Sequence, residues 1–462
     1  MAHALALSLP LLAAATPADL LAARSQMALT LGFHIVLACL GVALPAMMLI
    51  AEARGHRRGD ADALLLARHW SSIVAVTFAV GAVSGTVLSF ELGLLWPGLM
   101  GQFGAAYGIP FAVEGIFFFL EAIFVAIYIY GWDRLSPRVH FLSGVPIALA
   151  GLGGTFSVVS ANAWMNQPAG FTLGPDGRIS EVRPLEVIFN GATWYEVPHM
   201  LLAAYMVTGF LLASVYAVGM LRGRRDAYMR LGFTIPFVVA AIAAPIQIGV
   251  GDVAAREVVK QQPAKFAAME LITETGPQRP VLIGGILVDG EVRYALEIPG
   301  LASFLAGFDT NTVVTGFDQI PPDERPPANV VHLAWDAMLT CGFALLGLGA
   351  WYGILRVRRR DPTTARWFLR GASIAGFLAI VAMEAGWIVT EVGRQPWIVW
   401  GRLRTAEAVT AAGGLEVSLV AVTILYGALG IATVVVLRAL SHRWNNETIS
   451  ESDLPYGGPG AR

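Results

Sequence analysis

The sequence predicts an all-α polytopic membrane protein with about nine transmembrane helices, and its composition and pattern carry that prediction. Of 462 residues, 56% are hydrophobic and only 14% are charged, against about 25% charged in ordinary soluble domains. Mean hydropathy is +0.63, and apolar stretches of roughly 20 residues recur along the whole length. These features exclude a water-soluble enzyme, and the net charge of −2 gives no reason to expect nucleic-acid binding.

Nine apolar stretches are long enough to cross a bilayer, some of them at a tilt. They run over Ser25–Ile50, His69–Trp96, Gly108–Trp132, Val139–Ala161, Val197–Leu221, Leu231–Val250, Asn329–Leu355, Trp367–Glu391 and Gly413–Leu437. Residues 25–250 therefore hold helices 1–6, and residues 329–440 hold helices 7–9. Both cysteines, Cys39 and Cys341, lie inside these stretches, which excludes a disulfide framework and a cysteine-rich metal site.

Arginine placement orients the bundle, because every connection that follows an odd-numbered span is basic. The arginines concerned are Arg54, Arg57, Arg58, Arg134, Arg138, Arg222, Arg224, Arg225, Arg230, Arg356, Arg358, Arg359, Arg360, Arg438 and Arg443. The loop expected over Pro97–Tyr107 carries no charge. The positive-inside rule then places the basic connections in the cytoplasm, the N-terminus outside and the C-terminus inside.

Three segments lie outside the spans. Residues 1–24 are expected to form an outer-face segment; an uncleaved segment is preferred to a cleaved signal peptide, because no basic stretch precedes its apolar part. The tail over residues 441–462 is polar and is expected to be cytoplasmic and disordered. The largest loop, residues 251–328, faces outward, and a loop this long between helices is usually functional. Within it, Val281–Ile298 predicts a hairpin that turns at Asp289-Gly290.

Ionisable and sulfur-containing side chains at membrane depth are candidate functional residues, because burying them in lipid is costly. In the expected topology, His34, His199, Met338 and Glu391 lie in the outer half of the membrane on four different helices. These side chain types serve as axial ligands of haem iron, and helical bundles build such sites in their interior. Taken alone, a histidine in a membrane span is more often a hydrogen-bonded packing residue than a ligand. His199 and Met338 differ in depth by roughly 10 Å, so they share an iron only if the fifth span begins earlier or the helices tilt.

Carboxylates on the third span form a second candidate group. Glu114 and Glu121 are seven residues apart and so share one helix face, and Asp133 stands at the inner end of the same span. Two stacked carboxylates in an apolar helix are typical of a proton relay, although hydrogen bonding to neighbouring helices would also account for them.

The large loop holds Lys265 and Glu270, about one and a half helical turns apart with apolar residues between them. Quinol oxidation needs acceptors for two hydroxyl protons and an apolar surface for the ring. On chemistry alone, a solvated surface pair is preferred to a quinol site.

The chain resembles subunit I of the cytochrome bd-type quinol oxidases over essentially its whole length, in the short quinol-loop branch. The matching stretches are Arg24–Thr30 with Phe33-His34, Gly85–Gly93, Glu114–Glu121, Tyr130–Leu135, Ala161–Met165, Glu384–Trp387 and Glu391–Trp397. No single stretch is specific, but all of them in this order on nine spans are.

The resemblance implies roles for individual residues. His199 and Met338 would be the axial ligands of a low-spin haem b, and His34 and Glu391 would hold two high-spin haems, one of type b and one of type d or b. Arg24 and Arg394 would pair with haem propionates. Trp387 would lie between haems. The remaining implied roles are proton delivery by Glu114, Glu121, Asp133 and Asn162, and quinol binding by Lys265 and Glu270.

The resemblance also implies an activity and partners. The chain would be the haem-bearing subunit of a terminal oxidase in the bacterial cytoplasmic membrane. It would oxidise quinol at the outer face and reduce O2 to water with cytoplasmic protons, and so generate a proton gradient without pumping. A second subunit, and in some complexes a small single-helix subunit, would accompany it. The quinone type, the d or b type of the third haem, and the assignment of His34 and Glu391 to individual high-spin haems stay open.

Two other classes share some of these features. A proton-coupled transporter would have buried carboxylates but no use for two histidines and a methionine at one level. A dihaem anchor subunit of a dehydrogenase would normally pair histidine with histidine. The sequence also departs from better-known oxidases: its quinol loop is short, Asp336 stands where many members have arginine, and Ala122 stands where some have serine.

Overall fold

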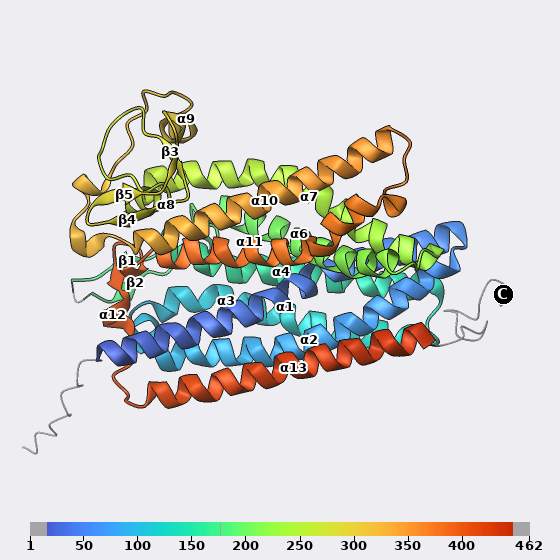
Figure 1. The fold of residues 1–462 in the computed structure, drawn as a ribbon. Helices are drawn as coiled ribbons and strands as arrows, with labels where there is room; N and C mark the ends of the chain where they lie inside the picture. Colours follow the sequence, from blue (N-terminus) through green and yellow to red (C-terminus); the bar gives the residue numbers. More distant parts are fainter. Residues whose placement is uncertain (1–15, 176, 447–462) are drawn as a thin grey trace, which may run out of the picture.

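The computed structural model describes residues 16–175 and 177–446, which form a bundle of long, roughly parallel helices (Figure 1). Within these ranges, nine helices are long and apolar enough to cross a membrane. They are α1 (Pro17–Arg58), α2 (Ala61–Leu95), α3 (Pro97–Gly131), α4 (Pro137–Asn166), α6 (Thr193–Leu221), α7 (Ala227–Gln261), α10 (Ala328–Val357), α11 (Arg366–Gly393) and α13 (Leu415–Asn446). The predicted fold class and the number of spans are confirmed. The expectations for residues 1–15 and for the tail beyond residue 446 lie outside the described residues.

Short elements gather at one end of the bundle, called here the loop end, where residues 167–192, 262–327 and 394–414 connect the long helices (Figure 1). Its helices are α5 (Pro184–Ile188), α8 (Pro263–Met269), α9 (Leu301–Gly307), α12 (Thr405–Ala408), η1 (Phe317–Gln319) and η2 (Pro322–Glu324). Its strands are β1 (Thr172–Leu173), β2 (Ile179–Ser180), β3 (Val281–Ile283), β4 (Ile286–Val288), β5 (Glu291–Arg293), β6 (Leu296–Ile298), β7 (Trp397–Val399) and β8 (Leu403–Arg404). The opposite end, called the arginine end, carries the basic connections and η3 (Pro362–Thr364).

Several helices begin at side chains suited to the position. Thr16 caps α1: its Oγ1 accepts from Asp19 N at 3.1 Å, and Thr16 N donates to Asp19 Oδ2 at 3.2 Å. Asp60 and Asp226 cap α2 and α7 by accepting from Ala63 N and Met229 N. Such caps satisfy N–H groups that have no partner within the helix.

The helices extend further than hydropathy alone predicts. The predicted loop Pro97–Tyr107 is wrong, because α3 already begins at Pro97, a residue whose missing N–H suits the first helical turn. α7 continues past Val250 to Gln261, so the loop begins eleven residues later than expected. Its polar final turns are held by the ion pairs of Arg256 with Asp252 and Lys260 with Glu257. Charged pairs at this spacing stabilise a helix beyond its apolar part.

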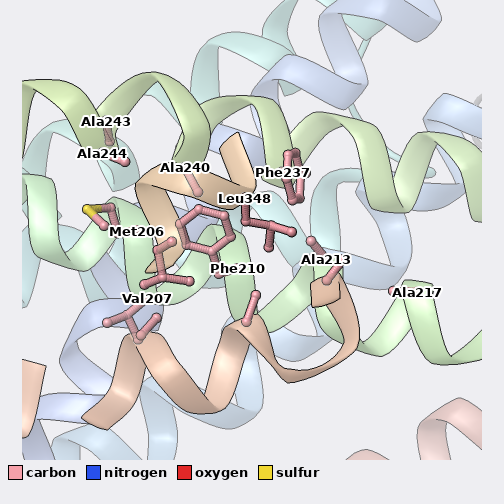
Figure 2. Close-up of a cluster of buried hydrophobic side chains, with 14 of the residues drawn as sticks. Met206, Val207, Phe210, Ala213, Ala217, Phe237, Ala240, Ala243, Ala244 and Leu348 are labelled. Carbon is pink, nitrogen blue, oxygen red and sulfur yellow. The ribbon is translucent and has the colours of Figure 1, made fainter. Parts of the chain in front are cut away.

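The main apolar core lies among α6, α7, α10 and α11. Figure 2 shows Met206, Val207 and Phe210 of α6 brought together with Phe237 of α7 and Leu348 of α10. The rings of Phe210 and Phe237 meet edge to face with centroids 5.6 Å apart, a favoured aromatic arrangement. These four helices also carry His199, Met338, Trp387 and Glu391, so the core fixes the position of most predicted ligands.

The predicted hairpin over residues 281–298 is confirmed. β3 pairs with β6 and β4 pairs with β5, both antiparallel, and the turn between β4 and β5 is Asp289-Gly290. Both turn residues have positive φ, 53° and 85°, as a two-residue hairpin turn requires. Asn329 at the start of α10 binds this hairpin twice: its Oδ1 accepts from Leu287 N at 2.6 Å, and its Nδ2 donates to Leu287 O at 3.0 Å.

Candidate functional site

His34 lies on α1 with its ring directed at α2. Its Nδ1 lies 2.9 Å from Ser84 Oγ, and the Ser84 hydroxyl donates to Gly81 O at 3.1 Å. Because that hydroxyl has one hydrogen, it accepts from His34 Nδ1–H, and this fixes the tautomer. The Nε2 lone pair is then free, which is the form in which histidine binds a metal. Ser84 is a site residue that the sequence reasoning missed.

His199 lies in the second turn of α6, against α7. Its Nε2 is 3.2 Å from Gln247 Nε2, and its Nδ1 is buried without a hydrogen-bond partner among the described residues. α6 begins at Thr193 rather than Val197, so the fifth span does start earlier than hydropathy predicts. His199 is now the seventh residue of its helix and Met338 the eleventh of α10, which reduces the predicted offset to about 6 Å.

The three predicted His and Met ligands share one local feature, since each faces a glycine of a neighbouring helix. A Cβ on that glycine would lie 3.1 Å from the ligand side chain in every case, for the pairs Gly85 with His34 Cε1, Gly251 with His199 Cε1 and Gly386 with Met338 Sδ. Glycine therefore lets each candidate ligand side chain lie directly against the neighbouring helix. Two imidazoles and a thioether inside a helical bundle are side chains that haem iron takes as ligands, so the residues present fit haem.

Glu391, at the end of α11, has two polar partners. Asn162 Nδ2 donates to its Oε1, and Arg394 Nη2 donates to its Oε2. Arg394 is only 1% exposed, yet its Nε and Nη1 have no partner among the described residues. Two unsatisfied guanidinium donors at this depth fit the carboxylates of a bound group. Asn162 and Arg394 are thus brought together with Glu391.

Glu114 and Glu121 lie on α3, where both are half-buried. Glu121 lies against α1, since a Cβ on Gly41 would be 3.9 Å from its Oε1. Glu384 of α11 also approaches α1: its Oε2 would lie 3.4 Å from a Cβ on Gly32. α1 therefore receives carboxylates from α3 and α11 on either side of His34 along the chain.

The other predicted residues lie further from these contacts. Asp133 follows α3 at the arginine end, with a side chain that is 67% exposed and an ion pair to Arg68 at 3.1 Å. Trp387 is half-buried and packs against the core of α6, α7, α10 and α11. Arg24 is half-buried on α1, and the structure gives it no hydrogen bond or ion pair within residues 16–175 and 177–446.

Lys265 and Glu270 are both buried, at 4% and 3% exposure, so the alternative of a solvated surface pair is wrong. Burial and the neighbouring Arg394 lower the pKa of Lys265 to about 7, and burial raises the pKa of Glu270 to about 7. Lys265 Nζ donates to Asn166 Oδ1 at 3.2 Å. Glu270 Oε1 accepts from Trp335 Nε1 at 2.9 Å, and its Oε2 has no partner in the described part of the chain.

Asp336 of α10 has a structural role. Its Oδ2 accepts from Gly284 N at 2.5 Å and lies 3.5 Å from His332 Nε2. The ring nitrogens of His332 lie 2.7 Å from Met269 O and 2.8 Å from Gly284 O. The carboxylate therefore fastens the hairpin to α10 two residues before Met338.

The sequence reasoning missed Asn166, Glu196 and Gln262. Asn166 joins the other two: its Nδ2 donates to Glu196 Oε1 at 2.9 Å, and its Oδ1 accepts from Gln262 Nε2 at 3.1 Å. Two signals were present in the sequence, because Asn166 directly follows the stretch Ala161–Met165 and Glu196 precedes His199 by about one helical turn.

Comparison with known proteins shows which family the chain is similar to. The family model described as cytochrome bd terminal oxidase subunit I matches residues 22–444. One relative, from Bacillus subtilis (strain 168), is provisionally named cytochrome bd menaquinol oxidase subunit I. It is 34% identical over 91% of this chain and 96% of its own length. Cytochrome bd-II ubiquinol oxidase subunit 1 of Escherichia coli (strain K12) is 26% identical over 90% and 95%. The solved structure of bd oxidase from Geobacillus thermodenitrificans superposes with a TM-score of 0.87 at 38% identity, covering 92% of this chain and 98% of that one.

Proposed function

The chain belongs to the cytochrome bd terminal oxidase subunit I family, and from this premise we propose that it is the haem-bearing catalytic subunit of a quinol oxidase that works without a proton pump. It is a quinol oxidase subunit and a multi-pass protein of the bacterial cytoplasmic membrane. Membership in the family implies haem cofactors. The number of haems, their ligands and the route of protons are the parts proposed here.

The proposal assigns three haems to the bundle. His199 and Met338 would hold a low-spin haem b, and His34 and Glu391 would each hold one high-spin haem, with Arg24 and Arg394 binding propionates. When bound, haem supplies the one-electron and oxygen chemistry that no side chain of this chain can supply. The observation that carries the assignment is the glycine facing each of His34, His199 and Met338.

The residues of the loop end would handle the protons of quinol. A neutral Lys265 and an ionised Glu270 can each accept a hydroxyl proton, and burial keeps the pKa of both near 7, where proton acceptance and release are balanced. The apolar surface around them is formed by α8 with α10 and α11. Phe266, Ala267 and Met269 of α8 are buried in this cluster, which suits an aromatic head group beside it.

Protons for water formation would come from the arginine end. The basic connections at this end face the cytoplasm under the positive-inside rule, and the loop end then faces outward. Glu114 and Glu121 would hold protons within the bundle, with Asn162 at Glu391 and Asp133 at the arginine end of the same route. Release of protons outside and their uptake inside generate a gradient without a pump.

Partner subunits would cover part of the exposed apolar surface. α13 exposes a row of residues seven apart, Val417 at 74%, Ile424 at 68% and Ile431 at 68%. α3 exposes Ile116 and Phe119 at 62% and 68%. Lipid and a second oxidase subunit, with a small single-helix subunit in addition, would share these faces.

The test is a reduced-minus-oxidised absorbance spectrum of the detergent-purified chain, with haem quantified as the pyridine haemochrome. Three haems per chain, one of them low-spin, are expected, and oxygen uptake should follow addition of quinol. Folded, complete protein without haem would overturn the proposal. Haem with no oxygen uptake would instead favour the dihaem anchor subunit.

A further inference from the structure

The loop end contains a buried ionic cluster whose charges come from three elements. Lys265 of α8 faces Glu196 of α6 and both Arg394 and Glu391 near the end of α11. When Lys265 is protonated, two cations and two carboxylates balance one another there, and mutual compensation of this kind is what permits charges to be buried. Glu196 also faces Tyr195 on its own helix, and Tyr195 faces Glu257 of α7.

Asn166, the last residue of α4, joins the members of this cluster. Its Nδ2 donates to Glu196 Oε1 at 2.9 Å and lies 3.3 Å from Asn162 Oδ1, which leads on to Glu391. Its Oδ1 accepts from Lys265 Nζ at 3.2 Å. At 1% exposure, one amide therefore holds the lysine and the glutamate in a fixed relation.

A cavity of about 430 Å³ adjoins the cluster at the loop end. Its wall is formed by the segment after α4, by Gly191 just before α6, by the end of α7 and by the turn between β7 and β8. The residues that form it include Asn166, Gln167, Ala169, Gln261, Trp400 and Arg402. Trp400 N donates to Met165 O at 2.9 Å, which fixes this turn against α4. Asn166 thus belongs both to the cavity wall and to the ionic cluster.

We propose that this cavity is the port through which protons from quinol reach the water outside, with Asn166 and Glu196 at its inner end. The proposal rests on the proposed function and names its proton exit. A cavity with this many amide and guanidinium groups can hold ordered water, whereas the apolar surface of α8 cannot.

Quinol loses two electrons and two protons to become quinone, and the electrons go to O2, the acceptor of the oxidase reaction. For the proton that follows this route, the neutral Lys265 amine takes it from a quinol hydroxyl, the resulting ammonium gives it to the Glu196 carboxylate, and Glu196 releases it to cavity water. The depressed pKa of Lys265, about 7, is consistent with an amine that gains and loses a proton each cycle.

The test separates proton exit from mere helix tethering. The holoenzyme in proteoliposomes is assayed with quinol, and with tetramethyl-p-phenylenediamine kept reduced by ascorbate, a donor that gives up an electron without a proton. Asn166→Leu breaks the bridge. Ala169→Phe fills the cavity without touching the ionic cluster, and Ala412→Phe is its control on an exposed alanine outside the cavity wall.

If the cavity is the port, Asn166→Leu and Ala169→Phe each slow quinol turnover roughly tenfold and raise its solvent deuterium isotope effect. Turnover with tetramethyl-p-phenylenediamine stays unchanged in both variants, and so does the haem absorbance. Ala412→Phe matches wild type in both assays. Glu196→Gln should behave like Asn166→Leu, and Glu196→Asp should recover much of the rate. Equal slowing with both donors, or no slowing in Ala169→Phe, overturns the port. A wild-type chain that oxidises neither donor contradicts the proposed function itself.

Discussion

Lys265 and Glu270 are five residues apart, yet their side chains are held on different helices. Lys265 Nζ donates to Asn166 Oδ1 of α4 at 3.2 Å, whereas Glu270 Oε1 accepts from Trp335 Nε1 of α10 at 2.9 Å. A quinol between them would therefore be contacted from two sides, and its two hydroxyl protons would leave toward different partners. The port proposed for Lys265 would serve one proton, and Glu270 would accept the other.

Quinol oxidation should become faster as pH rises through about 7. Burial raises the pKa of Glu270 to about 7 and lowers that of Lys265 to about 7, so both accepting forms accumulate above this pH. Glu270→Gln should lower kcat/KM roughly tenfold or more and flatten its rise with pH, at unchanged haem content. The same variant should be more stable than wild type at pH 8 but not at pH 4, because the raised pKa costs stability only once the unfolded carboxyl ionises. Thermal unfolding and steady-state kinetics at several pH values measure both effects, and a pH profile identical to that of wild type would contradict the role.

Loss of either low-spin ligand should abolish the low-spin absorbance band without unfolding the protein. His199→Ala and Met338→Leu each delete one predicted axial ligand, and low-spin iron needs two strong ones. The reduced-minus-oxidised spectrum should lose its low-spin band in both variants while the high-spin bands remain. A low-spin band that survives in both would move the ligands elsewhere.

Replacing Arg394 should weaken both the fold and haem binding. Arg394→Met leaves Glu391 without its cation, which we expect to lower the free energy of unfolding by about 2 kcal/mol, below the full cost of breaking a buried pair because Glu391 is partly exposed. Arg394→Lys keeps the charge but loses the spare guanidinium donors, so it should keep stability and still lose haem. Thermal unfolding and haem content separate the two effects. Full haem content in Arg394→Met would exclude the propionate role.

A methyl group on Gly386 should disturb Met338 specifically. A Cβ there lies 3.1 Å from Met338 Sδ, closer than ordinary contact allows. Gly386→Ala should shift the low-spin haem potential measurably or convert part of it to high spin. Gly353→Ala, on the same helix as Met338 but with no atom within 4 Å of its Cβ, is the matched control and should gain about 0.5 kcal/mol in stability. Equal spectra in the two variants would show that the thioether is not a ligand.

The fold was predictable because lipid imposes a simple rule on composition, and nine apolar stretches satisfy it. Helix ends were not, because they depend on caps such as Thr16 and on ion pairs such as Arg256 with Asp252, which hydropathy does not register. The error at Pro97–Tyr107 is of this kind, since an uncharged segment at the bilayer surface continues as helix when its first residue suits a first turn.

The candidate site was predictable in its ligands but not in its connections. The family resemblance named His34 and Glu391, but Ser84 beside His34 and Asn162 beside Glu391 are brought there by packing between distant helices. Asn162 and Glu391 are 229 positions apart, and no local spacing encodes such a contact. Asn166 and Glu196 were missed for a related reason: their places beside Met165 and His199 are visible in the sequence, but the contacts of Asn166 with Lys265 and Glu196 are not.

Asn329 binds Leu287 through both groups of its amide, as a neighbouring strand would, and Asp336 holds Gly284 about two turns further along α10. These hydrogen bonds attach the hairpin to the helix that carries Met338, so the two are expected to move together. A molecule that displaces the hairpin would also displace α10. Binding at the loop end would therefore change the position of the Met338 thioether. The position of the short loop is therefore coupled to the position of the Met338 sulfur.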